Sequence, residues 1–329
     1  MKKINIALCI IHRPTHFHIV QNALNNFDIK KIVYITDNKS CLMYLKLLKI
    51  NNVLFFSLPT FSKIITNPLL IIFYTVLFFI FRFLLNIFNN FISVFLTHDY
   101  NSLSVLFASK DNYYFIQDGL GLESSINNYN SVAYKKSKIC FLSPNLYYGK
   151  YAKEIWLRTS SKLKNKKFFK TSKIHFYDEK SLFNKKVLSS NKLEKNLKYP
   201  PKNSIIFLGC NLEIDQSNLL IKFYKKISKL SGKRNFYYKP HPSGDDTANI
   251  SSLSKKLIPH YIPIELFDIS EKNYIFISLY SSSSFIYNQH LILLNYESMY
   301  DDRVMISKAE FDDKLNQFLI TNHHILNLN

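Results

Sequence analysis

Strand-like and helix-like segments alternate along the first half of the chain, and this alternation constrains the fold more than any other feature. Short apolar runs typical of buried strands stand at 4–10, 31–36, 52–58 and 112–117. Helical patterns at 14–27 and 39–49 separate the first three of these runs. Such alternation predicts a parallel sheet whose strands are joined by crossover helices.

The second half of the chain restarts the same pattern. Strands are expected at 204–209, 234–239, 273–279 and 291–296, and an amphipathic helix at 217–230 that ends at Ser231 and Gly232. Between the halves, residues 161–197 are rich in Lys, Ser and Asn and are expected to be a linker region. A chain of 329 residues is long enough for two domains. We therefore predict an α/β fold with two Rossmann-like domains facing a cleft, at 1–198 and 199–329.

The charge of the chain is high, but its composition does not favour nucleic acid as a partner. The net charge is +20, yet only five of the 43 basic residues are Arg. Arg supplies the fork of donors that reads phosphates and base edges, so a charge made mostly of Lys indicates diffuse attraction. The four cysteines stand far apart and form no metal or disulfide pattern, which favours a reduced cytoplasm.

One long apolar segment, residues 68–96, suggests contact with a membrane. We expect it to be helical. A spanning helix needs about 20 apolar residues, and a charge at its centre costs roughly 2.5 to 3.5 kcal/mol. Arg82 and several Asn residues interrupt the segment, so a buried helix or a helix on the bilayer surface is favoured over a span. We therefore expect the protein to be cytoplasmic and to associate peripherally with the cytoplasmic face of the inner membrane.

Candidate site residues of the first half follow predicted strands, where ligands of doubly wound sheets bind. Asp118 stands between the strand at 112–117 and Gly119, a placement that suits a general base; an ordinary Asp-Gly turn is the alternative. Three histidines lie in the segment 12–18. Because Pro14 separates His12 from His16 and no acidic or thiolate ligand stands nearby, we predict no metal there. The segment is instead expected to form a loop that faces the acceptor.

The second half carries a sharper signal in "FYYKPHPSGDD" at 236–246. Pro240 and Pro242 restrict the backbone on both sides of His241, so the imidazole is held rigidly at the end of a strand. Rigid placement suits an acid catalyst or a phosphate ligand. Further on, Glu265 interrupts an apolar run at 262–268, and a serine-rich turn at 278–287 offers hydroxyl and N–H groups to a phosphate. A solvated glutamate and a serine N-cap are the alternatives for these two features.

The order Asp-Gly, His-Pro, Glu, Ser-Ser along two α/β halves resembles the bacterial lipooligosaccharide sialyltransferases, with the polysialyltransferases as relatives. The resemblance implies a GT-B glycosyltransferase architecture and inverting transfer from CMP-sialic acid to a terminal sugar, such as galactose, of lipooligosaccharide or capsule. It implies no metal and no cofactor beyond the donor substrate. Asp118 would be the base and His241 would serve the donor phosphate and leaving group. Glu265, Ser282 and Ser283 would bind the ribose and phosphate of the donor. From their places at predicted strand ends, Gly209, Lys239 and Pro242 are further donor-binding candidates.

One departure affects the base. Gln117 stands where many relatives carry a second acid, so the role of base rests on Asp118 alone. Two alternatives stay open: a transferase that uses another sugar nucleotide such as CMP-Kdo, and a non-catalytic membrane-surface protein. The acceptor, the linkage, the number of sugars added and the formation of a homodimer also stay open.

Overall fold

The computed structural model consists of two compact units, Met1–Leu182 and Phe183–Asn329. The residues that it describes are 1–59, 61–97, 101–108, 113–118, 149, 152–159, 169, 173–178, 182, 198–210, 217–232, 235–242, 246, 248–268, 270, 272–279, 288–294 and 307–326. The division between the units falls within the region expected to be a linker, whereas the sequence placed the boundary after residue 198.

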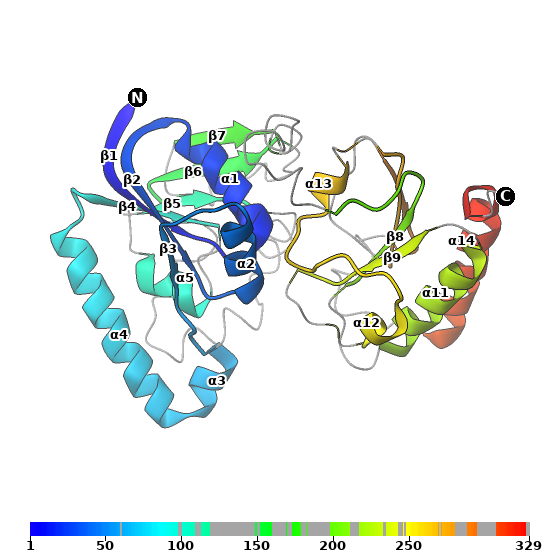
Figure 1. Cartoon of the computed structure of the whole chain (residues 1–329). Helices are drawn as coiled ribbons and strands as arrows, with labels where there is room; N and C mark the ends of the chain where they lie inside the picture. Colours follow the sequence, from blue (N-terminus) through cyan, green and yellow to red (C-terminus); the bar gives the residue numbers. More distant parts are fainter. Residues whose placement is uncertain are drawn as a thin grey trace. The chain divides into compact units, whose positions relative to one another are not determined.

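The first unit is built on a parallel sheet of seven strands in the order β3-β2-β1-β4-β5-β6-β7 (Figure 1). The strands are β1 Lys2–Ile10, β2 Phe27–Thr36, β3 Val53–Phe55, β4 Ile92–Leu96, β5 Tyr113–Ile116, β6 Glu154–Arg158 and β7 Ile174–Tyr177. The helices are α1 Pro14–Leu24, α2 Lys39–Leu47, α3 Phe61–Thr66, α4 Pro68–Ile87 and α5 Ser102–Phe107. All the strand pairs of this sheet are parallel, as the alternating pattern predicts.

Alternate side chains of each strand serve the two faces of this sheet. Val94 and Leu96 of β4 pack in one core cluster with residues of α3, α4 and α5. Phe95, which lies between them, instead stacks on Tyr114 of β5. On that second face, Phe17 of α1 packs against Tyr34 of β2. The sheet is therefore covered by helices on both sides, which explains why the inner strands β4 and β5 are largely apolar.

The apolar segment at 68–96 is not one helix, and this corrects the expectation from the sequence. Helix α4 ends at Ile87, the backbone turns through Phe88, and 92–96 form the central strand β4. The residues "ISVFL" of this strand are rich in β-branched and aromatic side chains, and two Asn residues precede them closely at a turn. Hydropathy alone did not separate the helix from the buried strand.

Besides β4, two further strands and one long helix were not expected from the sequence. Strand β6 is short, and β7 lies inside the region expected to be a linker, yet both extend the first sheet. In the second unit, the C-terminal helix α14 Lys308–Leu326 carries buried residues at Phe311, Leu315 and Phe318. Strand β7 is exposed along much of its length, so it lacks the continuous apolar run that identifies a buried strand.

The second unit is built on a parallel sheet of four strands in the order β11-β10-β8-β9. The strands are β8 Ile205–Leu208, β9 Phe236–Lys239, β10 Ile275–Ser278 and β11 Gln289–Ile292. The other helices are α11 Ser217–Leu230, α12 Ile250–Leu253 and α13 Glu265–Asp268. Helix α11 has the bounds that its pattern predicts, and Gly232 follows it with φ +56°, the left-handed backbone that favours glycine.

Helices α11 and α14 pack side by side over one face of this second sheet. Phe223 of α11 lies against both Phe207 of β8 and Phe318 of α14. At the surface, Lys222 of α11 donates to Asp312 of α14 over 2.5 Å. The chain thus has two α/β units with parallel sheets, as the sequence predicts.

Candidate functional site

Polar side chains gather at the carboxyl edge of the first sheet. Six neighbouring strands each end close to one or more of them: Asp37 follows β2, His12 and His16 follow β1, Thr97 follows β4, Asp118 follows β5, Arg158 ends β6 and Tyr177 ends β7. The hydrogen bonds described below join the residues that follow β2, β1, β4 and β5. This edge is where ligands bind in sheets of this kind.

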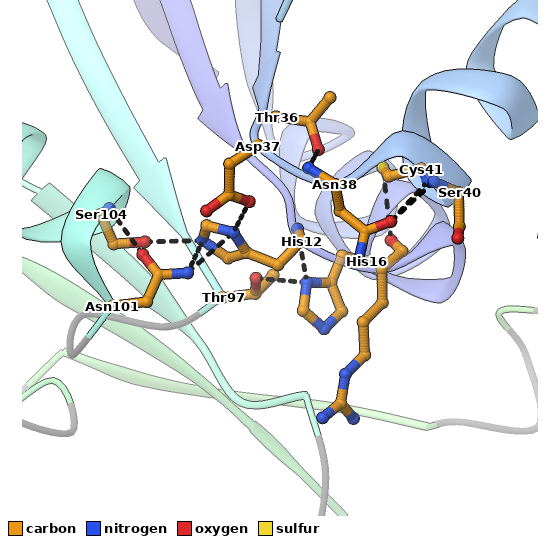
Figure 2. A network of polar contacts seen from close by, with 11 residues as sticks. His12, His16, Thr36, Asp37, Asn38, Ser40, Cys41, Thr97, Asn101 and Ser104 are labelled. Carbon is orange, nitrogen blue, oxygen red and sulfur yellow. Dashed lines mark hydrogen bonds and ion pairs between the residues drawn. The ribbon is translucent and has the colours of Figure 1, made fainter. Parts of the chain in front are cut away.

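His12 is the centre of a polar network at the ends of β1 and β2 (Figure 2). Its Nδ1 lies 2.8 Å from Oδ1 of Asp37, and its Nε2 lies 2.8 Å from Oγ of Ser104. A carboxylate only accepts hydrogen bonds, so Nδ1 carries a proton, and in the neutral ring Nε2 accepts from the serine hydroxyl. Asn101, whose side chain also caps α5, lies 2.8 Å from the same ring. The ring of His12 is thereby fixed between the ends of β2 and α5.

His16 connects this network to Asp118. It is fully buried, and its Nε2 lies 3.2 Å from Oδ2 of Asp118. Its Nδ1 accepts from the backbone N–H of His12 over 3.2 Å and lies 2.7 Å from Oγ1 of Thr97. Because Nδ1 is an acceptor, a neutral His16 carries its proton on Nε2 and donates it to the carboxylate. The imidazole therefore orients Asp118, whose side chain is only 13% exposed.

The residues on the other side of Asp118 have structural roles. Oε1 of Gln117 accepts from the backbone N–H of Arg158 over 3.0 Å, and the carbonyl of Gln117 accepts from the hydroxyl of Tyr177. Burial raises the pKa of Tyr177, and the charge of Asp118 adds to the rise while Arg158 opposes it. Gln117 thus ties three strands together, and Asp118 is the carboxylate at the end of β5.

In the second unit, Gly209 and His241 lie together at the carboxyl ends of β8 and β9. The N–H of Gly209 donates to the carbonyl of Lys239 over 2.8 Å. A Cβ atom on Gly209 would lie 2.6 Å from Oη of Tyr238 and 3.1 Å from the backbone nitrogen of His241. Only glycine fits this close approach without a shift of its neighbours. His241 and Pro242 are both half-buried at this edge.

Lys239 is a buried lysine directly before the corner of Pro240 and His241. Its Nζ donates to the carbonyls of Pro240 and His260 over 3.3 and 3.4 Å. Burial lowers the pKa of Lys239 to about 8, although the charge of Glu265 opposes this effect. The pKa of His260 is lowered by its own burial and by the charge of Lys239. A lysine with a lowered pKa at a strand end is typical of a functional site.

The remaining predicted residues divide into two groups. Glu265 begins helix α13, is half-buried and interacts electrostatically with Lys239. Ser282 and Ser283 lie outside the described residues. The last described residues before them are Ser278, which ends β10, and Leu279. Since β10 pairs with β8, Ser278 lies beside Leu208, the residue before Gly209.

Within the part of the chain that the structure describes, no group of three or more His, Cys, Asp and Glu side chains is placed to hold a metal ion. In the same part of the chain, three cysteines, Cys9, Cys41 and Cys210, are buried free thiols.

Sequence reasoning missed the roles of His12, His16 and Asp37. A loop that faces the acceptor was expected at 12–18 and a helix at 14–27. The helix is confirmed, because Pro14 is the first residue of α1 and His16 lies in its first turn. Asp37 was not singled out. The available signal was its place directly after a predicted strand, which is the same signal that identified Asp118.

No protein-family model and no curated protein sequence matches this chain. Its fold matches solved structures. The UDP-GlcNAc 2-epimerase from Neisseria meningitidis bound to UDP-GlcNAc has a TM-score of 0.55 and 14% identity, over 98% of this chain and 93% of that one. The UDP-GlcNAc 2-epimerase from Methanocaldococcus jannaschii in complex with UDP-GlcNAc and UDP has a TM-score of 0.52 and 13% identity, over 84% and 78%. The chain therefore has the GT-B-like fold of these UDP-GlcNAc 2-epimerases.

Proposed function

We propose that this protein is an inverting sialyltransferase that transfers sialic acid from CMP-sialic acid to a terminal sugar of a cell-surface glycan. The observation that carries the proposal is the pair of His16 and Asp118, a buried imidazole that donates to a carboxylate at the carboxyl edge of the first sheet. The GT-B-like fold and the order of motifs along both units support it.

On the acceptor, Asp118 takes the proton of the attacking hydroxyl as that oxygen bonds to the anomeric carbon of the donor. An effective base must hold its carboxylate in one orientation within reach of the substrate. His16 supplies that orientation through its Nε2 proton, and Thr97 and the backbone of His12 hold His16 in turn. Asp118 remains partly exposed, as a group that must meet a substrate does.

On the donor, the bond between the anomeric carbon and the phosphate oxygen breaks, and CMP leaves with the electron pair. The developing negative charge is stabilised by hydrogen-bond donors placed in advance. We assign this role to His241, with Lys239 adding positive charge behind it and Ser282 and Ser283 donating to the phosphate. Gly209 and Pro242 shape the backbone around His241, and Glu265 binds the ribose hydroxyls.

A second candidate is a nucleotide-sugar 2-epimerase, because the structures reported above are epimerases of this fold. An epimerase needs no acceptor, which separates the two candidates. A transferase with another donor, such as CMP-Kdo, is the variant of the first proposal that keeps the same phosphate and ribose contacts.

The experiment incubates the purified chain with CMP-sialic acid, with and without a lactoside, and follows products by mass spectrometry. A sialylated lactoside is the expected product, and it should form equally in EDTA. Parallel reactions contain UDP-GlcNAc alone, or CMP-Kdo with the lactoside. Conversion of UDP-GlcNAc to its 2-epimer without an acceptor would replace the proposal by the second candidate.

The matched variants are Asp118→Ala and Asp28→Ala. Asp118→Ala should reduce transfer by a factor of about 10² to 10⁴, the usual effect of losing a general base. Its affinity for CMP should stay within a few-fold, since Asp118 contacts the acceptor. Asp28 is exposed on β2, so its loss should leave transfer unchanged. Equal transfer by both variants would show that Asp118 is only a turn residue.

A further inference from the structure

Helix α4 exposes a continuous stripe of large apolar side chains. The stripe repeats every three or four residues, which places its members on one face of the helix. Seven of them are between 51% and 76% exposed: Leu69, Ile72, Phe73, Val76, Phe79, Phe83 and Ile87. Soluble surfaces rarely carry apolar patches of this extent unless another surface covers them.

The opposite face of α4 packs against the core of the first unit. Tyr74 and Leu85 are buried there, and Ile71, Leu77 and Phe81 pack on the same core cluster. The hydroxyl of Tyr74 donates to the carbonyl of Ser102 over 2.5 Å, and Arg82 donates to the carbonyl of Val105 over 3.3 Å. Both acceptors belong to α5. The helix is long and apolar enough to cross a membrane, but a span would break these contacts.

The charges around α4 suit an anionic surface. No Asp or Glu occurs anywhere in residues 38–98, while five Lys and Arg residues do. Helix α3, which lies in this range, contacts α4 and carries no carboxylate, and its Lys63 is exposed. Helix α5, at 102–107, also contacts α4 and also carries no carboxylate. The first unit holds 24 of the 43 basic residues but only 9 of the 23 acidic ones, an excess of 15 positive charges. Anionic headgroups attract such a surface and add to the binding of an apolar stripe.

We propose that α4 docks the protein on an anionic lipid bilayer, with the helix lying parallel to the surface and its apolar stripe immersed in the outer part of the acyl layer. A helix with one apolar face and one face fixed to protein binds an interface in this way. The docking is independent of the reaction proposed above. Its place in the fold is notable, because α5, which holds the inner face of α4, also supplies Ser104 and Asn101 to His12.

Flotation with vesicles of phosphatidylglycerol and phosphatidylcholine tests the docking on the full chain. The chain should float with mixed vesicles, and less with pure phosphatidylcholine or at high salt. Phe79→Glu should weaken the partition by about ten-fold or more, since a large apolar contact is lost. The control is Ile320→Glu on α14, which replaces a side chain that is 78% exposed in the other unit and should leave flotation unchanged.

The orientation is tested with Leu69→Trp, Val76→Trp and Phe83→Trp, measured by quenching with lipids brominated at different depths. The native Trp156 is buried and gives the background, which is subtracted. A helix parallel to the surface places all three indoles at one shallow depth. A deep Val76→Trp between two shallow ends would instead show a span, and would overturn the in-plane orientation.

Two further results would overturn the docking itself. The first is an absence of flotation with mixed vesicles at low salt. The second is a dimer in light scattering that Phe79→Glu converts to a monomer while lipid binding stays absent, because the stripe would then be covered by a second copy of the chain. Circular dichroism and melting of Phe79→Glu show that the variant is folded.

Discussion

The Nε2 atom of His16 lies 3.2 Å from Oδ2 of Asp118, although 102 positions separate the two residues. The contact forms because β1 and β5 lie on either side of β4 in a parallel sheet, so residues that follow them emerge at one edge. Buried between Thr97 and Asp118, His16 is held as the tautomer that donates to the carboxylate. We regard His16 as a positioning residue for the proposed base.

His16→Ala should lower kcat by about ten- to hundred-fold, since the carboxylate loses its orienting donor and not its own function. It should also displace the acidic limb of the pH profile of kcat/KM, because a hydrogen bond to the carboxylate favours its charged form. The control is His18→Ala in the same helix. His18 is buried and bonded to the hydroxyl of Tyr44, so its loss should lower stability without moving the pH profile. Identical pH profiles for wild type and His16→Ala would reduce His16 to a packing residue.

His241→Ala should lower both turnover and affinity for CMP. A charge-assisted hydrogen bond is worth about 1.5 to 3 kcal/mol, so the expected loss of affinity is about ten- to hundred-fold if the imidazole binds as a cation. Pro242→Ala should show a milder loss, because it loosens the backbone without deleting the ring. Calorimetric titration with CMP measures both, with His324→Ala on α14 as the exposed control. If His241→Ala binds CMP normally but melts at a lower temperature, His241 and its flanking prolines have a structural role only.

Strand β6 was not predicted, but most other strands, the helices before residue 60 and the amphipathic helix α11 were predictable because the hydrophobic period and the terminal residues agree there. The end of α4 was not, since helix and buried strand are equally apolar across 68–96. Strand β7 was hidden because it is largely exposed. At the site, single residues such as Asp118 and His241 could be identified as candidates because they directly follow predicted strands. Their partners were not, because the contact of His16 with Asp118 depends on the order of strands in the sheet, which the sequence does not state.

Lys239→Met should change stability in a manner that depends on pH. Burial lowers the pKa of Lys239 in the folded state to about 8, from 10.5. Between these two values the unfolded chain binds more protons than the folded one, so wild-type stability rises with pH across this window. Below pH 8 the cost of the buried charge is fully present. We therefore expect the variant to melt several degrees above wild type at pH 7, with a gap that narrows towards pH 10.

The control for this change is Lys255→Met, which removes an exposed lysine of the same unit and should show no gap that depends on pH. Nucleotide binding by Lys239→Met should be weaker than that of wild type, since the proposed donor site loses a positive charge. A lower melting temperature for Lys239→Met at pH 7 would contradict the expectation, and would show that the hydrogen bonds to Pro240 and His260 outweigh the cost of burial.

Gly209→Ala tests whether the close approach of Gly209 to Tyr238 and His241 is needed for the proposed binding of CMP. The added Cβ would lie 2.6 Å from Oη of Tyr238 and 3.1 Å from the nitrogen of His241. Overpacking of this kind costs about 1 to 3 kcal/mol. Tyr238 cannot yield easily, because it is buried and its hydroxyl donates to Asp246 over 2.9 Å. We expect lower stability and weaker CMP binding in this variant.

A double-mutant cycle with Tyr238→Phe separates the clash with Oη from the two contacts at 3.1 Å, which are with Cζ of Tyr238 and with the nitrogen of His241. Removing Oη relieves the shorter contact, so the free energies of unfolding should be non-additive, with the double variant more stable than the sum of the single losses predicts. CMP binding should stay weak, because the contact with the nitrogen of His241 remains. Gly232→Ala is the matched control: its nearest contact would be 3.9 Å away, and its cost comes from φ +56°, so Tyr238→Phe should not alter it. If the losses in the free energy of unfolding for Gly209→Ala and Tyr238→Phe are additive, the strain does not arise from the contact with Oη.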